Sequence, residues 1–286
     1  MIRATASGWR AHAALMASGG VAKVIAPLSH SYYAEAAGEL IWIGEPNALL
    51  HPRAVLAPEA PVPPAAMSIN IALGAVAPWR PATLCAPLPR PRDGARLLYA
   101  AFVAIGKPRG LVRVFATGGE DDLVTTQARP HIAALARASA ADDAAAFADA
   151  ARPLLGLGTG LTPSCDDFVG GALFARRVFL GMDPTWDAAV ARIVADAAYL
   201  THPISARLLA DLAGGEGWAP LHELASAFAA DDLKAAVAAA RRVKTLGHTS
   251  GWDLLAGTVA SLGGSAAKQS YKTPPSAARH KWPFTH

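Results

Sequence analysis

Short runs of alternating apolar and polar residues occur throughout the first 120 positions of the chain. Such alternation, with β-branched and aromatic residues, is typical of strands that bury one face. Glycines and prolines separate the runs and indicate turns. We therefore expect an N-terminal β-rich region over residues 1–120, with strands at residues 21–25, 40–43, 68–71 and 111–115.

The pattern changes near residue 130, where alanine-rich segments place apolar residues at helical spacing. Residues 132–155 fit this spacing, and Asp142 and Asp143 can start a new helix partway along. The predicted fold is α+β, with a mainly helical region over residues 121–263. Further helices are expected after Pro163, over residues 186–200, from Ser205 to Gly214, and from Pro220 and Asp231.

The tail over residues 264–286 is polar, basic and contains proline, which predicts disorder. It holds four of the 26 basic residues, so the remaining basic residues balance the 22 acidic ones. A neutral body gives no electrostatic reason to expect a nucleic-acid or membrane partner. An apolar content of 52% against 17% charged residues predicts a globular protein.

Cysteine usage and hydropathy favour a cytoplasmic location. Cys85 and Cys165 lie far apart and lack metal-ligand spacing, as is usual in a reducing compartment. The longest uncharged run, residues 60–79, contains four prolines and does not predict a membrane-spanning helix. Residues 11–16 are too short and weakly apolar for a secretory signal.

The stretch at residues 156–171, G-L-G-T-G-L-T-P-S-C-D-D-F-V-G-G, is the most informative part of the chain. Its three alternating glycines, Gly156, Gly158 and Gly160, permit positive φ and a close approach of the backbone to another group. We expect Thr162 to cap a helix that starts at Pro163. Free N–H groups at such a helix start favour a small anion, although a plain glycine hinge would share this pattern.

Two other loop-to-helix junctions carry similar side chains. Thr201 and Ser205 flank one junction, and Ser250 and Asp253 open the other. Each alone is ordinary helix capping. Together they suggest that several helix N-termini converge on one polar pocket, to which His30 and His51 of the β-rich region are further candidate contributors.

Several familiar sites are not indicated. The glycine stretch lacks the lysine of a P-loop, no good strand precedes it as in a dinucleotide-binding fold, and no serine has the neighbours of a nucleophile elbow. A thiolate at Cys165 is an alternative, since helix starts lower thiol pKa values. Asp166 and Asp167 could bind Mg²⁺ together with an anion. Because consecutive helical residues diverge by about 100°, we expect only one of the two to face a site.

The glycine stretch resembles the signature G-x-G-x-G-L-T-P-S-G-D-D of a bacterial family long described as of unknown function. One branch of that family is associated with oxamate carbamoyltransferase in allantoin degradation. Later blocks at residues 204–209 and 250–257 are also similar to that family. The resemblance covers most of the chain, from the region of His30 to about Gly263. The chain departs from the signature at Cys165, where the family has glycine.

The resemblance implies carbamoyl transfer between oxalurate, phosphate, oxamate and carbamoyl phosphate, beside other, larger subunits. As the main hypothesis, Asp166, Asp167 and Ser164 are catalytic. A small anionic substrate would contact Gly156, Gly158, Gly160, Thr162, Ser164, Thr201, Ser205, Ser250, Asp253 and His30. Two alternatives stay open, namely a non-catalytic assembly subunit and a Mg²⁺-dependent phosphoryl-transfer enzyme.

Overall fold

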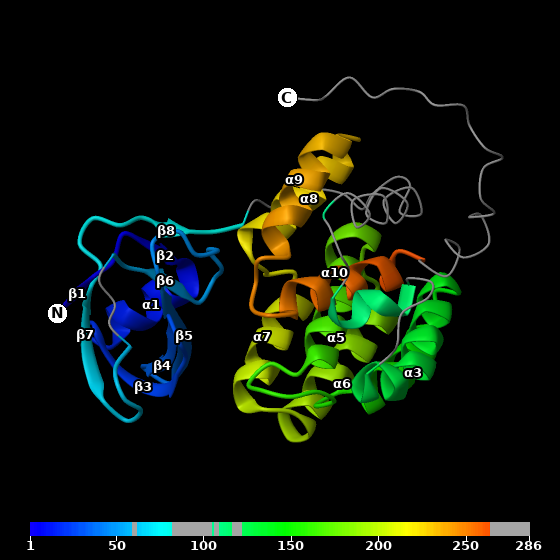
Figure 1. Ribbon diagram of the computed structural model, residues 1–286, viewed down its shortest axis with the longest axis horizontal. Coiled ribbons are helices and arrows are strands. Elements are labelled where there is room, and N and C mark those ends of the chain that lie inside the picture. The colour runs from blue at the N-terminus through cyan, green and yellow to red at the C-terminus, as the bar shows by residue number, and fades with distance from the viewer. Residues whose placement is uncertain (59–61, 82–104, 106–108, 116–121, 264–286) are drawn as a thin grey trace.

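The computed structural model describes residues 1–58, 62–81, 105, 109–115 and 122–263. Within these residues a strand-rich N-terminal region is followed by a helical C-terminal half (Figure 1). The predicted α+β class is therefore confirmed. The predicted disordered tail, residues 264–286, lies outside the described residues.

The N-terminal strands form one sheet that curves around helix α1 (Trp9–Ala17) as a half-barrel, in the order β1-β7-β3-β4-β5-β6-β2-β8. Alternate residues face the helix, as in β3, where Ala22 and Val24 are buried between exposed neighbours. The strands are β1 (Ile2–Arg3), β2 (Ala6–Gly8), β3 (Val21–Pro27), β4 (Tyr32–Ala36), β5 (Glu39–Gly44), β6 (Ala54–Leu56), β7 (Ser68–Ala72) and β8 (Pro78–Trp79).

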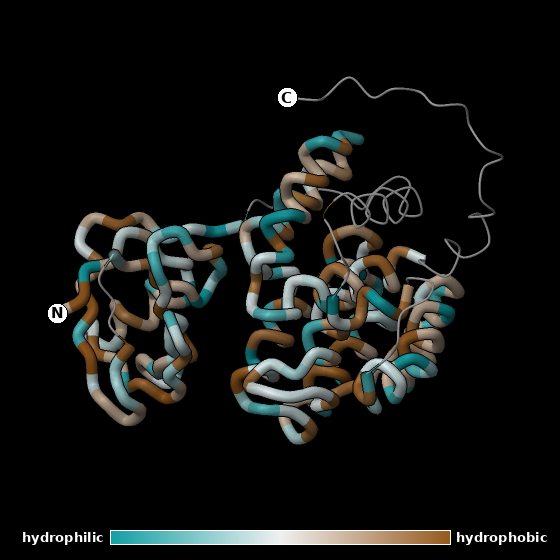
Figure 2. The backbone as a smooth tube through the Cα atoms, viewed as in Figure 1, coloured by the Kyte–Doolittle hydropathy of each residue, from teal (hydrophilic) through white to brown (hydrophobic). Residues whose placement is uncertain are grey.

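The C-terminal half is a helical bundle. Hydrophobic and hydrophilic residues recur at helical spacing along helices such as α3, which is buried on one side (Figure 2). Asp143 caps α4, as its sequence position predicts, by accepting the N–H of Ala146. The helices are α3 (Leu123–Ala140), α4 (Ala144–Ala151), α5 (Ser164–Ala175), α6 (Pro184–Leu200), α7 (Pro203–Ala213), α8 (Ala219–Ala229), α9 (Leu233–Val243) and α10 (Ser250–Ser261).

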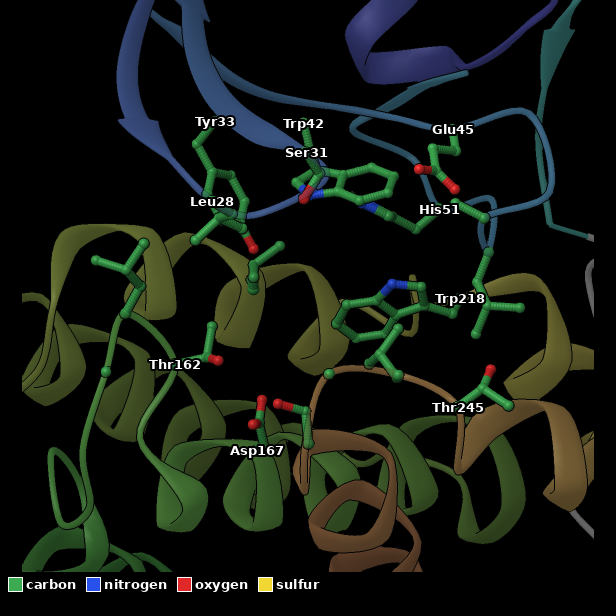
Figure 3. A pocket seen from close by; sticks show the side chains of 18 of the residues that line it. Leu28, Ser31, Tyr33, Trp42, Glu45, His51, Thr162, Asp167, Trp218 and Thr245 are labelled. Atoms are coloured by element: carbon green, nitrogen blue, oxygen red, sulfur yellow. The ribbon is translucent and has the colours of Figure 1, made fainter. Parts of the chain in front are cut away.

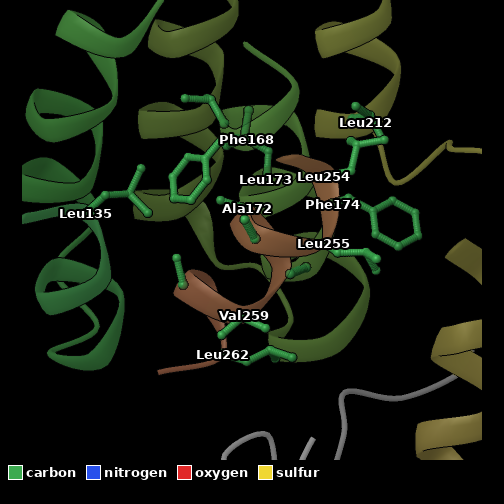
Figure 4. Close-up of a cluster of buried hydrophobic side chains, with 14 of the residues drawn as sticks. Leu135, Phe168, Ala172, Leu173, Phe174, Leu212, Leu254, Leu255, Val259 and Leu262 are labelled. Carbon is green, nitrogen blue, oxygen red and sulfur yellow. The ribbon is translucent and has the colours of Figure 1, made fainter. Parts of the chain in front are cut away.

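Helices α5 and α10 form the centre of the bundle and are buried along nearly their whole lengths (Figure 4). Glycines let their backbones touch. A Cβ at Gly257 would lie 1.8 Å from the carbonyl oxygen of Phe168, and one at Gly171 would lie 2.1 Å from that of Leu254. The N-termini of α5 and α10 also meet, since the hydroxyl oxygens of Ser164 and Thr249 lie 3.5 Å apart.

The predicted strand at residues 111–115 is wrong. Gly110–Phe115 is a 3₁₀ segment, η1, that packs against α10. Leu111, Val112 and Val114 are buried in the helical core, so the alternation did not mark one face of a sheet.

Three predicted helix starts are displaced by one residue. Helix α5 begins at Ser164, with Pro163 rather than Thr162 at the capping position and no side-chain cap. Helix α8 begins at Ala219 rather than Pro220. Asp232, not Asp231, caps α9, because the Asp232 side chain accepts the N–H of Ala235.

A buried ion pair joins the two halves. Arg53, beside β6, donates from Nε and Nη2 to the two carboxylate oxygens of Asp211 on α7, at 2.6 and 2.9 Å. Arg53 also donates to Glu39, and Arg10 of α1 contacts both Asp211 and Glu216. The sheet and α7 are thereby held in one arrangement, which shapes the cavity between them.

Candidate functional site

The glycine-rich loop runs from Gly156 into α5, and its backbone geometry requires glycine at two points. Gly156 has φ of +77°, and a Cβ there would lie 2.2 Å from the carbonyl oxygen of Leu200. Gly158 has φ of +131°, and a Cβ there would lie 2.7 Å from the backbone nitrogen of Ser164. Gly160 also has positive φ, at +89°. The loop therefore folds tightly back on the start of α5.

Asp166 braces this loop. Its carboxylate accepts the backbone N–H of Gly156 at 2.7 Å, the hydroxyl of Ser205 at 2.6 Å, and the hydroxyl of Thr201. Burial raises the pKa of Asp166, and these three hydrogen bonds oppose the rise. The junction before α7 and the start of α5 are thus tied together through Asp166.

A cavity of about 610 Å³ lies between the sheet and the helical half (Figure 3). This volume is typical of small-molecule sites. The sheet side of the cavity is formed by Leu28, Ser31, Tyr33, Trp42, Glu45, Asn47, Ala48, Leu49 and His51. The helical side is formed by Gly160, Leu161, Thr162, Asp167, Leu208, Trp218, Thr245, Leu246, Gly247 and Ser250.

Asp167 lies at the floor of this cavity with its carboxyl group directed toward it (Figure 3). The residue is 6% exposed, and Oδ2 has no hydrogen-bond partner among the described residues. Burial raises the pKa of Asp167 well above its ordinary value, the Ser250 hydroxyl lowers it, and the Asp253 and Asp166 carboxylates raise it further. This environment favours the neutral acid, which has both a donor and an acceptor.

The wall opposite Asp167 is largely aromatic, and Glu45 is its acidic residue among the described lining residues. The His51 ring lies 5.3 Å from that of Trp218 and 5.7 Å from that of Trp42, between centroids. Burial lowers the pKa of His51 to about 3, and Nδ1 accepts the backbone N–H of Arg53 at 3.3 Å. His51 is therefore neutral, with its proton on Nε2. Burial, with a smaller contribution from Asp167, raises the pKa of Tyr33, so Tyr33 stays a phenol.

Three residues of the glycine-rich loop that line this cavity have backbone N–H groups without an acceptor among the described residues. In the described part of the chain, no hydrogen-bond acceptor meets the N–H groups of Gly160, Leu161 and Thr162. These three residues line the same cavity as Asp167. The described lining residues include no lysine or arginine, so these N–H groups and nearby hydroxyls are the means by which it could hold a negative charge.

A second cavity, of about 490 Å³, adjoins the same loop. Gly158, Thr159 and Ser164 form its loop side, and Thr249 and His248 lie before α10. The rest of the lining is Arg109, Gly110, Leu111, Arg113, Asp122, Val124 and Thr125. The glycine-rich loop therefore contributes residues to two cavities of different character.

Asp253 is fully buried near this second cavity. Its Oδ1 accepts the N–H of Leu111 at 2.7 Å, while its Oδ2 has no hydrogen-bond partner among the described residues. Burial raises the pKa of Asp253 to about 6. The Leu111 N–H and, more weakly, the nearby Thr249 and Ser164 hydroxyls act against this rise. Asp253 thus holds η1 against the start of α10.

The structure separates the predicted site residues into groups. Gly160, Thr162, Asp167 and Ser250 line the larger cavity, whereas Gly158 and Ser164 line the second. Gly156, Thr201 and Ser205 contact Asp166 instead. The side chain of His30 is 82% exposed, and His30 is absent from the linings of both cavities.

The thiolate alternative at Cys165 is contradicted. Cys165 is fully buried, and burial with four nearby carboxylates raises its pKa to about 12. Sequence reasoning did not identify Tyr33, Trp42, Trp218, Arg109 or Arg113 as site residues. No local pattern marks them, because only the packing of distant segments brings them to the loop.

Among the described residues, no three His, Cys, Asp or Glu side chains are grouped so that they could hold a metal ion. The Mg²⁺ suggested by Asp166 and Asp167 stays a prediction. Within the same part of the chain, no helix is both long and apolar enough to span a membrane.

Comparison with known proteins finds similarity to one protein family. No curated protein and no solved structure matches the chain. Residues 154–262 match the model of a family described as oxamate carbamoyltransferase subunit AllH. The matched segment contains the glycine-rich loop, α5, α7 and α10, but not the strand-rich region. The helical half of this chain is thus similar to a subunit of an oxamate carbamoyltransferase.

Proposed function

We propose that this chain is a substrate-binding subunit in carbamoyl transfer. Its larger cavity would hold a small acid that carries a carboxamide or ureido group, such as oxamate or oxalurate. The family match supports the reaction class. The observation that supports the site most directly is Asp167, a buried carboxyl with an unpaired oxygen at the cavity floor.

A neutral carboxylic acid pairs well with a carboxamide. The acid O–H donates to the amide oxygen, and the acid carbonyl accepts an amide N–H. Burial of Asp167 favours the protonated form that this pairing needs. The negative end of the ligand would meet the N–H groups of Gly160, Leu161 and Thr162 at the rim of the same floor.

The same pairing suits the reaction. When phosphate attacks oxalurate, one phosphate oxygen bonds to the ureido carbonyl carbon and the bond from that carbon to the oxamate nitrogen breaks. The proton of hydrogen phosphate passes to that nitrogen, which gives oxamate and carbamoyl phosphate. An acid that donates to the carbonyl oxygen stabilises the negative charge that develops there. Asp167 has this role in the proposal, and Asp166 is a positioning residue that braces the loop.

A thermal-shift screen of the purified chain tests this proposal. A ligand that binds only the folded state raises its stability by mass action. We expect oxamate, oxalurate and carbamoyl phosphate to raise the melting temperature, and Asp167→Leu to abolish the rise. Asp149→Leu, the same change at an exposed residue of α4 outside the site, is the matched control. A shift from ATP with Mg²⁺ alone would favour phosphoryl transfer, and no shift from any ligand would favour a non-catalytic assembly subunit.

A further inference from the structure

His51 is a buried residue of the larger cavity that the proposed function does not use. It lies on the sheet side, between β5 and β6, and outside the segment that matches the carbamoyltransferase subunit family. The residue is 5% exposed. Its Nδ1 accepts the N–H of Arg53 at 3.3 Å, so the neutral ring carries its proton on Nε2. His51 thus has one N–H group left to donate.

This N–H group is available to a ligand. Within the described residues, Nε2 of His51 has no hydrogen-bond partner. The fully buried side-chain atoms without a partner in the same part of the chain belong to Tyr32, Asp167, Arg176 and Asp253. Nε2 of His51 is not one of these atoms, so it keeps accessible surface. Because His51 lines the larger cavity, that surface faces the cavity.

The surroundings of His51 fix this donor and keep water from it. The rings of Trp218 and Trp42 lie 5.3 and 5.7 Å from the His51 ring, between centroids. A hydrogen bond is stronger in such apolar surroundings than in water. Arg53, whose N–H meets Nδ1, is itself held by Asp211 at 2.6 and 2.9 Å. The ring is therefore oriented before any ligand arrives.

The ligand group that suits this donor is a neutral acceptor. Glu45 lines the same wall, and its carboxylate repels a second negative charge there. A single uncharged N–H among apolar rings also does not offset the cost of desolvating an anion. A carbonyl oxygen accepts the hydrogen bond without either penalty. His51 is thus suited to a carbonyl group rather than to a carboxylate.

We propose that His51 is a specificity-determining residue, whose Nε2 donates to a ligand carbonyl oxygen remote from the group that Asp167 binds. This proposal rests on the function proposed above for the same cavity. Asp167 lies on the helical side and His51 on the sheet side of a cavity of about 610 Å³, so only a ligand with separated carbonyl groups meets both (Figure 3). Oxalurate has a second carbonyl beside its ureido group, whereas oxamate lacks it. His51 therefore favours oxalurate over oxamate.

Two substitutions separate the donor role of His51 from its structural role. His51→Asn retains an acceptor for the Arg53 N–H but has no group at the position of Nε2. His51→Gln supplies an amide N–H near that position but loses the acceptor for Arg53. A donor role predicts weaker binding in the Asn variant, whereas a purely structural role predicts damage in the Gln variant alone.

Isothermal titration of the full chain with oxalurate and oxamate tests the proposal. We expect His51→Asn to bind oxalurate about tenfold more weakly than the wild type, and oxamate within about threefold. His51→Gln should bind oxalurate within about threefold of the wild type. In thermal unfolding the order is reversed, because His51→Gln leaves the Arg53 N–H without its acceptor and is the less stable variant.

His202→Asn is the matched control. The exposed His202 also accepts, at Nδ1, the N–H of the residue two positions on, at 3.2 Å from Ile204, and it is not part of the described cavity lining. This variant should bind both ligands as the wild type does.

Asp167→Leu separates this proposal from the proposed function. Oxalurate binding by His51→Asn equal to that of the wild type, or an equal weakening of oxamate, would overturn the role of His51. A loss in Asp167→Leu would in that case still support the proposed function. A loss in His51→Asn with full binding by Asp167→Leu would contradict the role of Asp167 and support that of His51. Absence of binding by the wild type would contradict both.

Discussion

Asp166 and Asp167 are adjacent in the chain, yet their carboxyl groups have opposite surroundings. Asp166 accepts three hydrogen bonds from the loop and from the start of α7, whereas Oδ2 of Asp167 has no partner among the described residues. The divergence of consecutive helical side chains accounts for this difference. One residue therefore braces the loop and the other faces the cavity.

Replacing Asp166 should destabilise the fold. In Asp166→Ala the N–H of Gly156 and the hydroxyls of Ser205 and Thr201 lose their shared acceptor in a poorly hydrated place. We expect a loss of about 2–4 kcal/mol in the free energy of unfolding, measured by urea denaturation. Asp149→Ala removes a carboxylate from an exposed pair with Arg192 and should cost less than about 1 kcal/mol. Equal costs for the two variants would contradict the bracing role.

The Arg53–Asp211 pair should be costly to break from one side. Both side chains are only 7% exposed, so Arg53→Met leaves a buried carboxylate without its main partner. We expect a loss of about 3–5 kcal/mol in urea denaturation, with partial recovery in the double variant Arg53→Met, Asp211→Leu. Arg242→Met breaks an exposed pair with Glu223 and is the matched control. A double variant less stable than the single would show that the pair is not the source of the loss.

The contact between α5 and α10 predicts a strong effect of one methyl group. Gly257→Ala would place its Cβ 1.8 Å from the carbonyl oxygen of Phe168, so the two helices must separate. We expect a loss of at least about 2 kcal/mol. Gly214→Ala is the control, because Gly214 has helical backbone angles and its nearest neighbour would lie 3.2 Å away. A Gly257→Ala variant as stable as Gly214→Ala would contradict the close contact.

The raised pKa of Asp253 predicts a pH dependence of stability. Burial raises this pKa from 3.8 to about 6, so the folded state binds a proton more tightly than the unfolded state. The stabilisation is fully present below pH 3.8 and is lost as pH rises through about 6, and it amounts to about 3 kcal/mol. Asp253→Asn keeps an acceptor for Leu111 and removes the titration. The stability of the wild type relative to this variant should therefore fall between pH 4 and 7, and a constant difference would contradict a raised pKa.

Local pattern was sufficient for most elements. Runs at residues 21–25 and 68–71 lie in β3 and β7, where alternation and one-sided burial coincide. The run at residues 40–43 lies in β5, which is buried on both faces, so its β-branched and aromatic residues rather than alternation mark the strand. The local pattern gave a wrong prediction at residues 111–115, because Leu111, Val112 and Val114 are buried by α10 and neighbouring helices rather than by a sheet.

The candidate site was predictable only in part. The glycine loop and Asp167 stand out in the sequence because glycines, hydroxyl residues and aspartates are concentrated within residues 156–167. Trp42 and Trp218 are 176 positions apart and meet at one cavity because contacts such as the Arg53–Asp211 pair join the two halves. Such long-range packing leaves no local signal. The domain boundaries at residues 120 and 263 and the catalytic roles stay predictions.

The most direct test of the central claim is the affinity for oxamate, measured by isothermal titration at pH 7 and pH 9 for the wild type, Asp167→Asn and Asp167→Leu. If Asp167 acts as a neutral acid, Asn can replace it, since its amide also has one donor and one acceptor for the ligand. We expect Asp167→Asn to bind within about threefold of the wild type and Asp167→Leu at least about tenfold more weakly, a loss of 1.4 kcal/mol or more. Only the wild type should weaken as pH rises. Binding by Asp167→Leu equal to that of the wild type, or a loss in Asp167→Asn as large as in Asp167→Leu, would contradict this account.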